Sequence, residues 1–491
     1  MGSSSLGVTF SVPYEIAAVR PLRQTTLDER EKTLRAAHYN TELVPQEMIY
    51  VDLCTDSGVS SLSTHQLAAL TSANFVEPGM GVAVEGSRSF ALLAEQVQRI
   101  FVFPFVVATT QGRSAERIWT RIHVKPGTVV AGNMLFPSTR AHIEMNGAKV
   151  IDVIGDAAHD LNSNEPFKDN LDLRKLEAVI QEHGADKVSC IYVELSVNSC
   201  GGHPVSLANL TEVKAIAAAD KIPLFLDACR ILENSFLIKE REAGFQSRTT
   251  QQIVQETCAL ADGCTMSALK DLLVSAGGLI LTRDKASYQK AIMQSFLDGA
   301  QLPGESMELF AAALGDIFAT DSYVTHRVGQ VNYLWRRLNG GVPLVSPPSG
   351  HGIFLNVHAF LPQVAPERFP AEALAAFIYL TSGIRVTKGP PLAPSQVARG
   401  MNLLRLAVPA RKYLQEHLDD VAEAILMPMP VETKFTDCSG SKIPPGPSTN
   451  RLISRGYERN ARTVGFFAAR PPSRSNFFSK SRRARRVVSP S

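Results

Sequence analysis

Short apolar runs alternate with longer amphipathic segments over most of the chain. The apolar runs are five to eight residues long, as expected of strands buried on both faces of a sheet. These strand candidates are Val102–Ala108, Val129–Phe136, Lys149–Ile154, Val188–Leu195, Ile222–Leu226 and Ala261–Met266. Segments between them, such as Ser87–Phe101 and Leu207–Ala219, read as helices. This alternation predicts an α/β fold with a mostly parallel sheet and helices on both faces.

The pattern changes after residue 322. Tyr323–Leu338 predicts a long helix that carries the chain away from the sheet. Gly350–Val357, Pro370–Leu380 and Leu403–Val408 predict a smaller α+β unit, and Ser439–Thr449 has the composition of a linker.

We therefore expect four parts. Residues 70–322 form a large domain, and residues 323–470 form a small domain. Residues 1–69, with a helix that Thr26 and Glu29 cap, contribute to the small domain. Residues 471–491 form a disordered basic tail.

Four polar residues directly follow strand candidates: Gln111, Asn198, Asp227 and Lys270. The carboxyl ends of parallel strands meet at one edge of a sheet, and ligands bind there in open α/β folds. The sequence therefore predicts a ligand site at this edge.

Lys270 lies between two apolar runs, Ala261–Met266 and Leu272–Ala276. Burial lowers the pKa of a lysine, and a neutral amine can attack a carbonyl group. Ser267, three residues earlier, offers a hydroxyl to a phosphate. Together they suggest the lysine to which pyridoxal phosphate (PLP) is attached. By itself the pattern is more typical of a surface lysine that follows a strand, so the assignment depends on the rest of the chain.

Thr109–Glu116 predicts a strand-to-helix turn that carries Gly112 and Arg113. The free N–H groups and the dipole of a helix N-terminus favour a phosphate. An ordinary helix cap with an exposed Arg113 explains the stretch equally well.

The composition is that of a soluble protein. The chain has 491 residues, of which 45% are hydrophobic and 20% are charged, and no apolar run approaches the roughly 20 residues that span a bilayer. Seven cysteines without metal-type spacing suggest reduced thiols, and the first residues lack a secretory pattern. We expect a cytoplasmic protein with no metal site and no membrane partner.

The net charge of +3 comes from the basic tail, which has six basic residues and no acidic residue. Without the tail the charge is near −3, so nothing in the body of the chain suggests nucleic-acid binding.

The motifs, taken together, resemble the β-eliminating lyases, the family of tyrosine phenol-lyase and tryptophanase. The segments that carry the resemblance are Tyr39–Thr41, Thr55–Gly58, Gly86–Arg88, Gln111–Arg113, Gly132–Met134 with Phe136, Val197–Asn198 with Gly201–Gly202, Asp227 with Arg230, Met266–Ser267 with Lys270–Asp271, and Arg405. The family implies a fold-type I (aspartate aminotransferase-like) PLP enzyme that is a homo-oligomer, a dimer or a tetramer.

The resemblance implies how the cofactor is held. Gln111, Gly112, Arg113 and Ser267 would bind its phosphate. Phe136 would stack on its ring, and Asn198 and Arg230 would contact its ring hydroxyl. Without the resemblance, Asp227 and Arg230 would be read as a structural salt bridge and Phe136 as a core aromatic residue.

The resemblance also implies three catalytic residues. Lys270 would bind the cofactor covalently and move the α-proton of the substrate. Asp227 would pair with the protonated ring nitrogen, and Arg405 would bind the substrate carboxylate.

The chain departs from the family in several places. Val84 stands where the family has a tyrosine that protonates the departing ring carbon. Val82 and Ser275 stand at positions of a monovalent-cation site, and Pro137 follows the stacking aromatic residue. These differences argue against binding of a monovalent cation and against phenol or indole as the leaving group.

We therefore predict an α,β-elimination of an aromatic amino acid or an S-substituted cysteine that gives pyruvate and ammonia. Two alternatives stay open: a PLP-dependent aldolase or transaminase, and an inactive homologue that acts as an interaction protein through its tail.

The basic tail is expected to be dispensable, because it has no apolar periodicity and its charges are uncompensated. A chain that ends at Arg470 should bind PLP and turn over substrate at the rate of the full chain. Loss of soluble protein or of PLP absorbance in this truncation would contradict the prediction.

Overall fold

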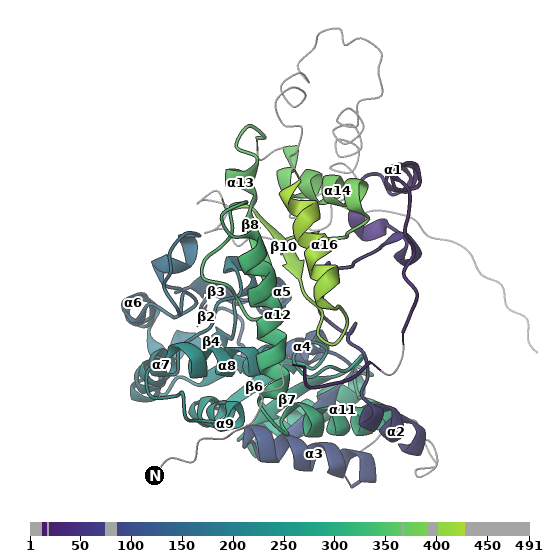
Figure 1. The fold of residues 1–491 in the computed structure, drawn as a ribbon. Helices are drawn as coiled ribbons and strands as arrows, with labels where there is room; N and C mark the ends of the chain where they lie inside the picture. Colours follow the sequence, from purple (N-terminus) through teal and green to yellow (C-terminus); the bar gives the residue numbers. More distant parts are fainter. Residues whose placement is uncertain (1–11, 17–18, 74–85, 366–367, 390–400, 428–491) are drawn as a thin grey trace, which may run out of the picture.

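The computed structural model describes residues 12–16, 19–73, 86–365, 368–389 and 401–427. Its larger sheet has seven strands in the order β1-β7-β6-β5-β4-β2-β3 (Figure 1). Their bounds are β1 (Phe105–Thr109), β2 (Val129–Gly132), β3 (Lys149–Asp152), β4 (Val188–Glu194), β5 (Leu224–Asp227), β6 (Gly263–Ser267) and β7 (Gly278–Thr282). Strands β3, β2, β4, β5 and β6 are parallel, and β7 is antiparallel to both β6 and β1. The predicted mostly parallel sheet is confirmed.

Helices cover both faces of this sheet. They are α3 (Arg88–Phe101), α4 (Gly112–His123), α5 (Pro137–Met145), α6 (Leu173–His183), α7 (Leu207–Ala219), α8 (Ile231–Arg241), α9 (Thr250–Leu260), α10 (Lys285–Leu297) and α11 (Gly304–Ile317). Successive strand residues point to opposite faces. In β4, for example, Ile191 and Val193 pack in one core, while Cys190 and Tyr192 pack with Trp119 of α4 in another. This double burial explains why the strands are continuously apolar.

A second, three-stranded sheet lies at the other end of the molecule (Figure 1). It is antiparallel, in the order β8 (Gly352–Asn356), β10 (Leu403–Ala407), β9 (Thr387–Lys388). The helices α12 (Ser322–Leu338), α13 (Val357–Phe360), α14 (Pro370–Ser382) and α16 (Gln415–Leu426) accompany it, and α12 runs from the large sheet toward it.

The N-terminal part of the chain packs on this second sheet. Helix α1 (Leu27–Ala36) contacts α14, and its N-cap Thr26 forms the predicted capping box with Glu29. Val51 and Leu53 belong to the core of the small sheet. Helix α2 (Thr64–Ala73) contacts α11 instead. The domain boundaries at residues 69 and 322 stay a prediction.

One predicted strand is shorter in the structure. The strand expected over Val102–Ala108 begins at Phe105, because Val102 takes a left-handed conformation (φ 52°) that ends α3, and the strand lies at the sheet edge. The second apolar run beside Lys270, Leu272–Ala276, forms no strand, and β7 begins after it at Gly278. Asp52, in the N-terminal segment, makes one bridge to Arg385.

Several predictions fall outside the described residues: those on Val82 and Val84, on the linker Ser439–Thr449, and on the basic tail. Within the described ranges, none of the helices has the length and apolarity needed to cross a membrane. The six cysteines of these ranges are free thiols, and the ranges contain no cluster of three or more possible metal-binding side chains.

Candidate active site

The start of α4 lies against the end of β6. Gly112 is the first residue of α4, and a Cβ atom at this position would lie 2.6 Å from the Cβ of Ser267. The N-cap residue, Gln111, makes no side-chain hydrogen bond to the helix. The first N–H groups of a helix have no partner within it, so they can bind an anion here together with the Ser267 hydroxyl. Gln111 and Arg113 are exposed at this edge.

Lys270 follows β6 in a turn and is half-buried. Its Nζ lies 5.2 Å from the centre of the Phe136 ring, at the start of α5. The next residue, Asp271, accepts hydrogen bonds from the N–H groups of Leu232 (2.8 Å) and Glu233 (3.3 Å) in the first turn of α8. The turn that carries Lys270 is therefore fixed to α8.

The expected depression of the Lys270 pKa is wrong for the protein alone. Burial acts to lower this pKa, but the neighbouring Cys229, Asp227 and Asp56 favour the ammonium, and the pKa is raised. The sequence placed the lysine between apolar runs but did not reveal the acidic groups around it.

Asp227 ends β5 and is buried. Its Oδ1 accepts a hydrogen bond from the N–H of Cys229 (3.1 Å), and the Cys229 sulfur accepts one from the N–H of Ser267 (3.1 Å). This chain of contacts links the carboxylate to Ser267, beside the start of α4. Two further buried carboxyl groups, those of Glu116 and Glu194, lie near Asp227.

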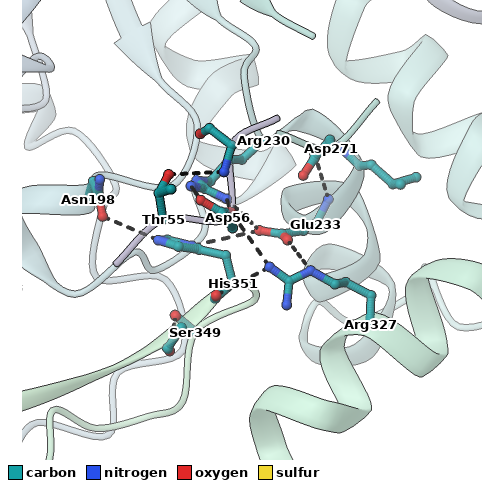
Figure 2. A network of polar contacts seen from close by, with 12 residues as sticks. Thr55, Asp56, Asn198, Arg230, Glu233, Asp271, Arg327, Ser349 and His351 are labelled. Carbon is teal, nitrogen blue, oxygen red and sulfur yellow. Dashed lines mark hydrogen bonds and ion pairs between the residues drawn. The ribbon is translucent and has the colours of Figure 1, made fainter. Parts of the chain in front are cut away.

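Arg230 is held by a buried ion pair, which Figure 2 shows at its centre. Its Nη1 and Nη2 lie 2.7 Å and 3.1 Å from the two carboxylate oxygens of Asp56. Burial opposes the charge of Asp56, but Arg230 outweighs it and holds the pKa of Asp56 far below its usual value. The shortest ion pair of Arg230 is thus with Asp56 of the N-terminal segment, where the sequence alone suggested Asp227.

Three residues that the sequence did not single out complete this network (Figure 2). Glu233 lies 3.5 Å from Arg230 and 3.3 Å from Arg327 of α12. His351 lies between them and Asn198, with its Nε2 3.2 Å from the Asn198 side-chain oxygen. Burial and Arg230 lower the pKa of His351 well below its usual value, so its ring is neutral. The only sequence signal was a charged or imidazole group within otherwise apolar segments.

Arg405 lies in the middle of β10. Its Nη2 donates to the backbone oxygen of Cys54 (3.1 Å), while its Nε is buried and has no partner within the described part of the chain. Burial lowers the pKa of this guanidinium. A buried donor without a partner suits a carboxylate ligand, which a guanidinium binds with two parallel hydrogen bonds.

These features fit pyridoxal phosphate. The edge offers an anion-binding helix start, an aromatic ring beside a lysine, and a buried carboxylate. Gly112, Phe136, Asp227 and Lys270 come from four different elements that the sheet brings together. Val82, at one position of the family's monovalent-cation site, lies outside the described residues.

Glu116 should make stability depend on pH. Burial and Asp227 raise the pKa of Glu116 to about 7, although Ser138 donates a 2.6 Å hydrogen bond to it. Because the folded-state pKa is raised, this group stabilises the fold below about pH 4.5 and loses that contribution as the pH rises through about 7. The full effect is about 3 kcal/mol.

We expect Glu116→Gln to gain stability relative to the wild type between pH 5 and pH 8, measured as the difference in unfolding free energy. The exposed Glu177→Gln is the matched control and should show no such change. Parallel pH profiles for wild type and Glu116→Gln would contradict the assignment.

Comparison with known proteins agrees with this geometry. Residues 52–424 match the model of the family described as "Beta-eliminating lyase". A tyrosine phenol-lyase of Symbiobacterium sp. (strain SC-1) is 42% identical over 426 residues, covering 84% of this chain and 91% of that protein. One from Pasteurella multocida (strain Pm70) is 42% identical over 428 residues, covering 84% and 92%.

Solved structures show the same fold at low sequence identity. A putative kynurenine aminotransferase of Saccharomyces cerevisiae aligns with a TM-score of 0.60 at 14% identity, over 82% of this chain and 96% of that one. A threonine aldolase of Leishmania major aligns with a TM-score of 0.56 at 15% identity, over 76% and 98%. The predicted fold class, that of fold-type I PLP enzymes, is confirmed.

Proposed function

We propose, since the chain belongs to the β-eliminating lyase family and is a PLP-dependent lyase, that its site eliminates a thiolate or an activated oxygen group from the β-carbon of an L-amino acid. With water, an S-substituted cysteine would give pyruvate, ammonia and a free thiol. The observation that carries the proposal is that Lys270 and Arg405, from different sheets, both interact electrostatically with the same Asp56–Arg230 pair.

The cofactor would be held by residues from several elements. Gln111, Gly112, Arg113 and Ser267 would bind its phosphate at the start of α4. Phe136 would lie on one face of its ring, and Asn198 and Arg230 would face its hydroxyl. The support for Gly112 and Ser267 is their close approach, and for Phe136 its contact with Lys270.

Three residues would do the chemistry. Bound PLP supplies an electron-withdrawing ring that stabilises negative charge at the substrate α-carbon. Asp227 would hold a proton on the ring nitrogen and so preserve that property. Lys270 Nζ would take the proton from the α-carbon, and Arg405 would orient the substrate by its carboxylate.

The choice of leaving group rests on the side chains at positions where the family recognises an aromatic ring. The arginine that the family uses for phenol recognition has no clear match in the region of residues 385–389. Arg385 pairs with Asp52 (2.7 Å), and Lys388 pairs with Glu372 (3.1 Å), so both cations are engaged. Pro137, the residue after Phe136, has no side-chain donor. Val84, where the family has its proton-donating tyrosine, has no proton to give.

Tyrosine is the second candidate substrate. It is favoured by the 42% identity to enzymes that are named tyrosine phenol-lyase. Elimination of phenol requires protonation of a ring carbon, whereas a thiolate leaves without this step.

A cytoplasmic homo-oligomer is the assembly that we propose. Three large apolar side chains at the end of α10, those of Met293, Phe296 and Leu297, are between 59% and 69% exposed in the single chain. Contact with a second subunit would remove them from water.

Lys270 should carry the cofactor. Borohydride reduction of the purified protein, followed by peptide mapping, should place the pyridoxyl group on Lys270 alone. Lys270→Ala should lose the label, and the exposed Lys285→Ala should keep it. A label on another lysine would overturn the assignment.

S-methylcysteine should be a better substrate than tyrosine or tryptophan. A positioned general acid contributes about 10²–10⁴-fold, so kcat/KM should favour S-methylcysteine by at least about 100-fold. Pyruvate release measures all three rates.

Two variants separate the contributions to this preference. Val84→Tyr should gain activity on tyrosine and keep activity on S-methylcysteine, while Arg405→Lys should lower kcat/KM for both. A wild type that prefers tyrosine would show that another residue provides the proton.

A further inference from the structure

Glu194 is a buried carboxylic residue beside the proposed cofactor site, and it has no role in the mechanism above. It ends β4 and is only 5% exposed. In the parallel pairing of β4 and β5, Glu194 lies directly opposite Asp227. Residues at the same register of neighbouring strands point to the same face of a sheet. The two carboxyl groups are therefore neighbours on that face.

The main chain of Glu194 is fixed from both sides by one side chain. The Asn133 amide nitrogen donates to the Glu194 backbone oxygen (2.9 Å), and the Glu194 N–H donates to the Asn133 amide oxygen (2.8 Å). The backbone position from which the Glu194 side chain extends is thus fixed at the end of β4.

The carboxyl group contacts two residues of the proposed site through their backbones. Its Oε1 accepts a hydrogen bond from the N–H of Asn198 (3.3 Å), and the backbone N–H of Phe136 faces the same carboxyl group and stabilises its charged form. Its Oε2 is buried and has no partner among the residues described. The Glu194 side chain therefore lies beside the backbones of Phe136 and Asn198 and beside Asp227.

We propose that Glu194 is a positioning residue: its carboxyl group fixes the backbones of Phe136 and Asn198 beside Asp227 and so shapes the pocket that receives the cofactor ring. This inference rests on the proposed cofactor site. Glu194 acts through these neighbours and does not itself take part in proton transfer from substrate.

Glu194 does this as a neutral acid. Burial, followed by the negative charge of Asp227, raises its pKa well above the usual value, against an opposing effect of Lys270. The other titratable groups that face it are those of Asp169 and Cys200. A neutral Glu194 adds no negative charge of its own beside the residue that would face the ring nitrogen.

The test measures the dissociation constant of PLP from the apoprotein by absorbance titration, together with kcat and KM. Glu194→Gln keeps a neutral acceptor and should bind PLP within about threefold of the wild type. Glu194→Ala leaves the Asn198 and Phe136 N–H groups without this acceptor and should weaken PLP binding by about tenfold or more. Cys190→Ala, buried on the same face of β4, is the matched control and should bind normally.

Glu194→Leu provides the apolar substitution if the alanine variant does not fold, with the same expected loss. PLP binding by Glu194→Ala or Glu194→Leu equal to that of the wild type would overturn the inference and leave the proposed function intact. Weak binding by Glu194→Gln would overturn the neutral-acid assignment. Failure of the wild type itself to take up PLP on Lys270 would instead refute the proposed site.

Discussion

The buried ion pair between Asp56 and Arg230 is the interaction on which the arrangement of the site depends. Asp56 lies in the N-terminal segment and Arg230 is the N-cap residue of α8, so the pair joins distant parts of the chain. Arg327 and His351 extend it to α12 and to the small sheet. Removing one partner of such a pair costs about 3–5 kcal/mol, because the other charge stays buried. The small sheet is thereby tied to the edge at which the parallel strands of the large sheet end.

A second constraint is the crowding of like charges around Asp227. Glu116 from α4 and Glu194 from β4 are both buried near it, and both have raised pKa values because burial and Asp227 disfavour a further negative charge. Neutral carboxylic acids can donate as well as accept hydrogen bonds. Glu194, and below about pH 7 also Glu116, can therefore lie beside Asp227 without adding a full negative charge of their own.

The sequence was sufficient for the fold class and for the residues that follow strands, because both depend on local periodicity and on the rule that parallel strands end at one edge. Lys270, Asp227 and Asn198 were predicted in this way to lie at the ends of strands, and the structure places them there. Glu194 was missed because it lies within an apolar strand, and His351 because it precedes β8 of the other sheet. The direction of the Lys270 pKa was also missed, since it depends on acidic neighbours that only the folded chain brings together.

The residues that would act at the α-carbon and those near the leaving group lie in different parts of the structure. A chain of this family can therefore keep the chemistry at the α-carbon while the leaving group changes. Lys270 and Arg405, which would act at the α-carbon, are held by the contacts of the turn after β6 with α8 and by the hydrogen bond from β10 to Cys54. Lys388 of β9 instead makes its ion pair with Glu372 at the surface, whereas Arg385 is paired with the buried Asp52. A substitution of Lys388 therefore disturbs few buried contacts, so this position can change without loss of the network around Asp227. A lyase with Val84 in place of a tyrosine is therefore expected to remain a lyase, with a different preference at the β-carbon.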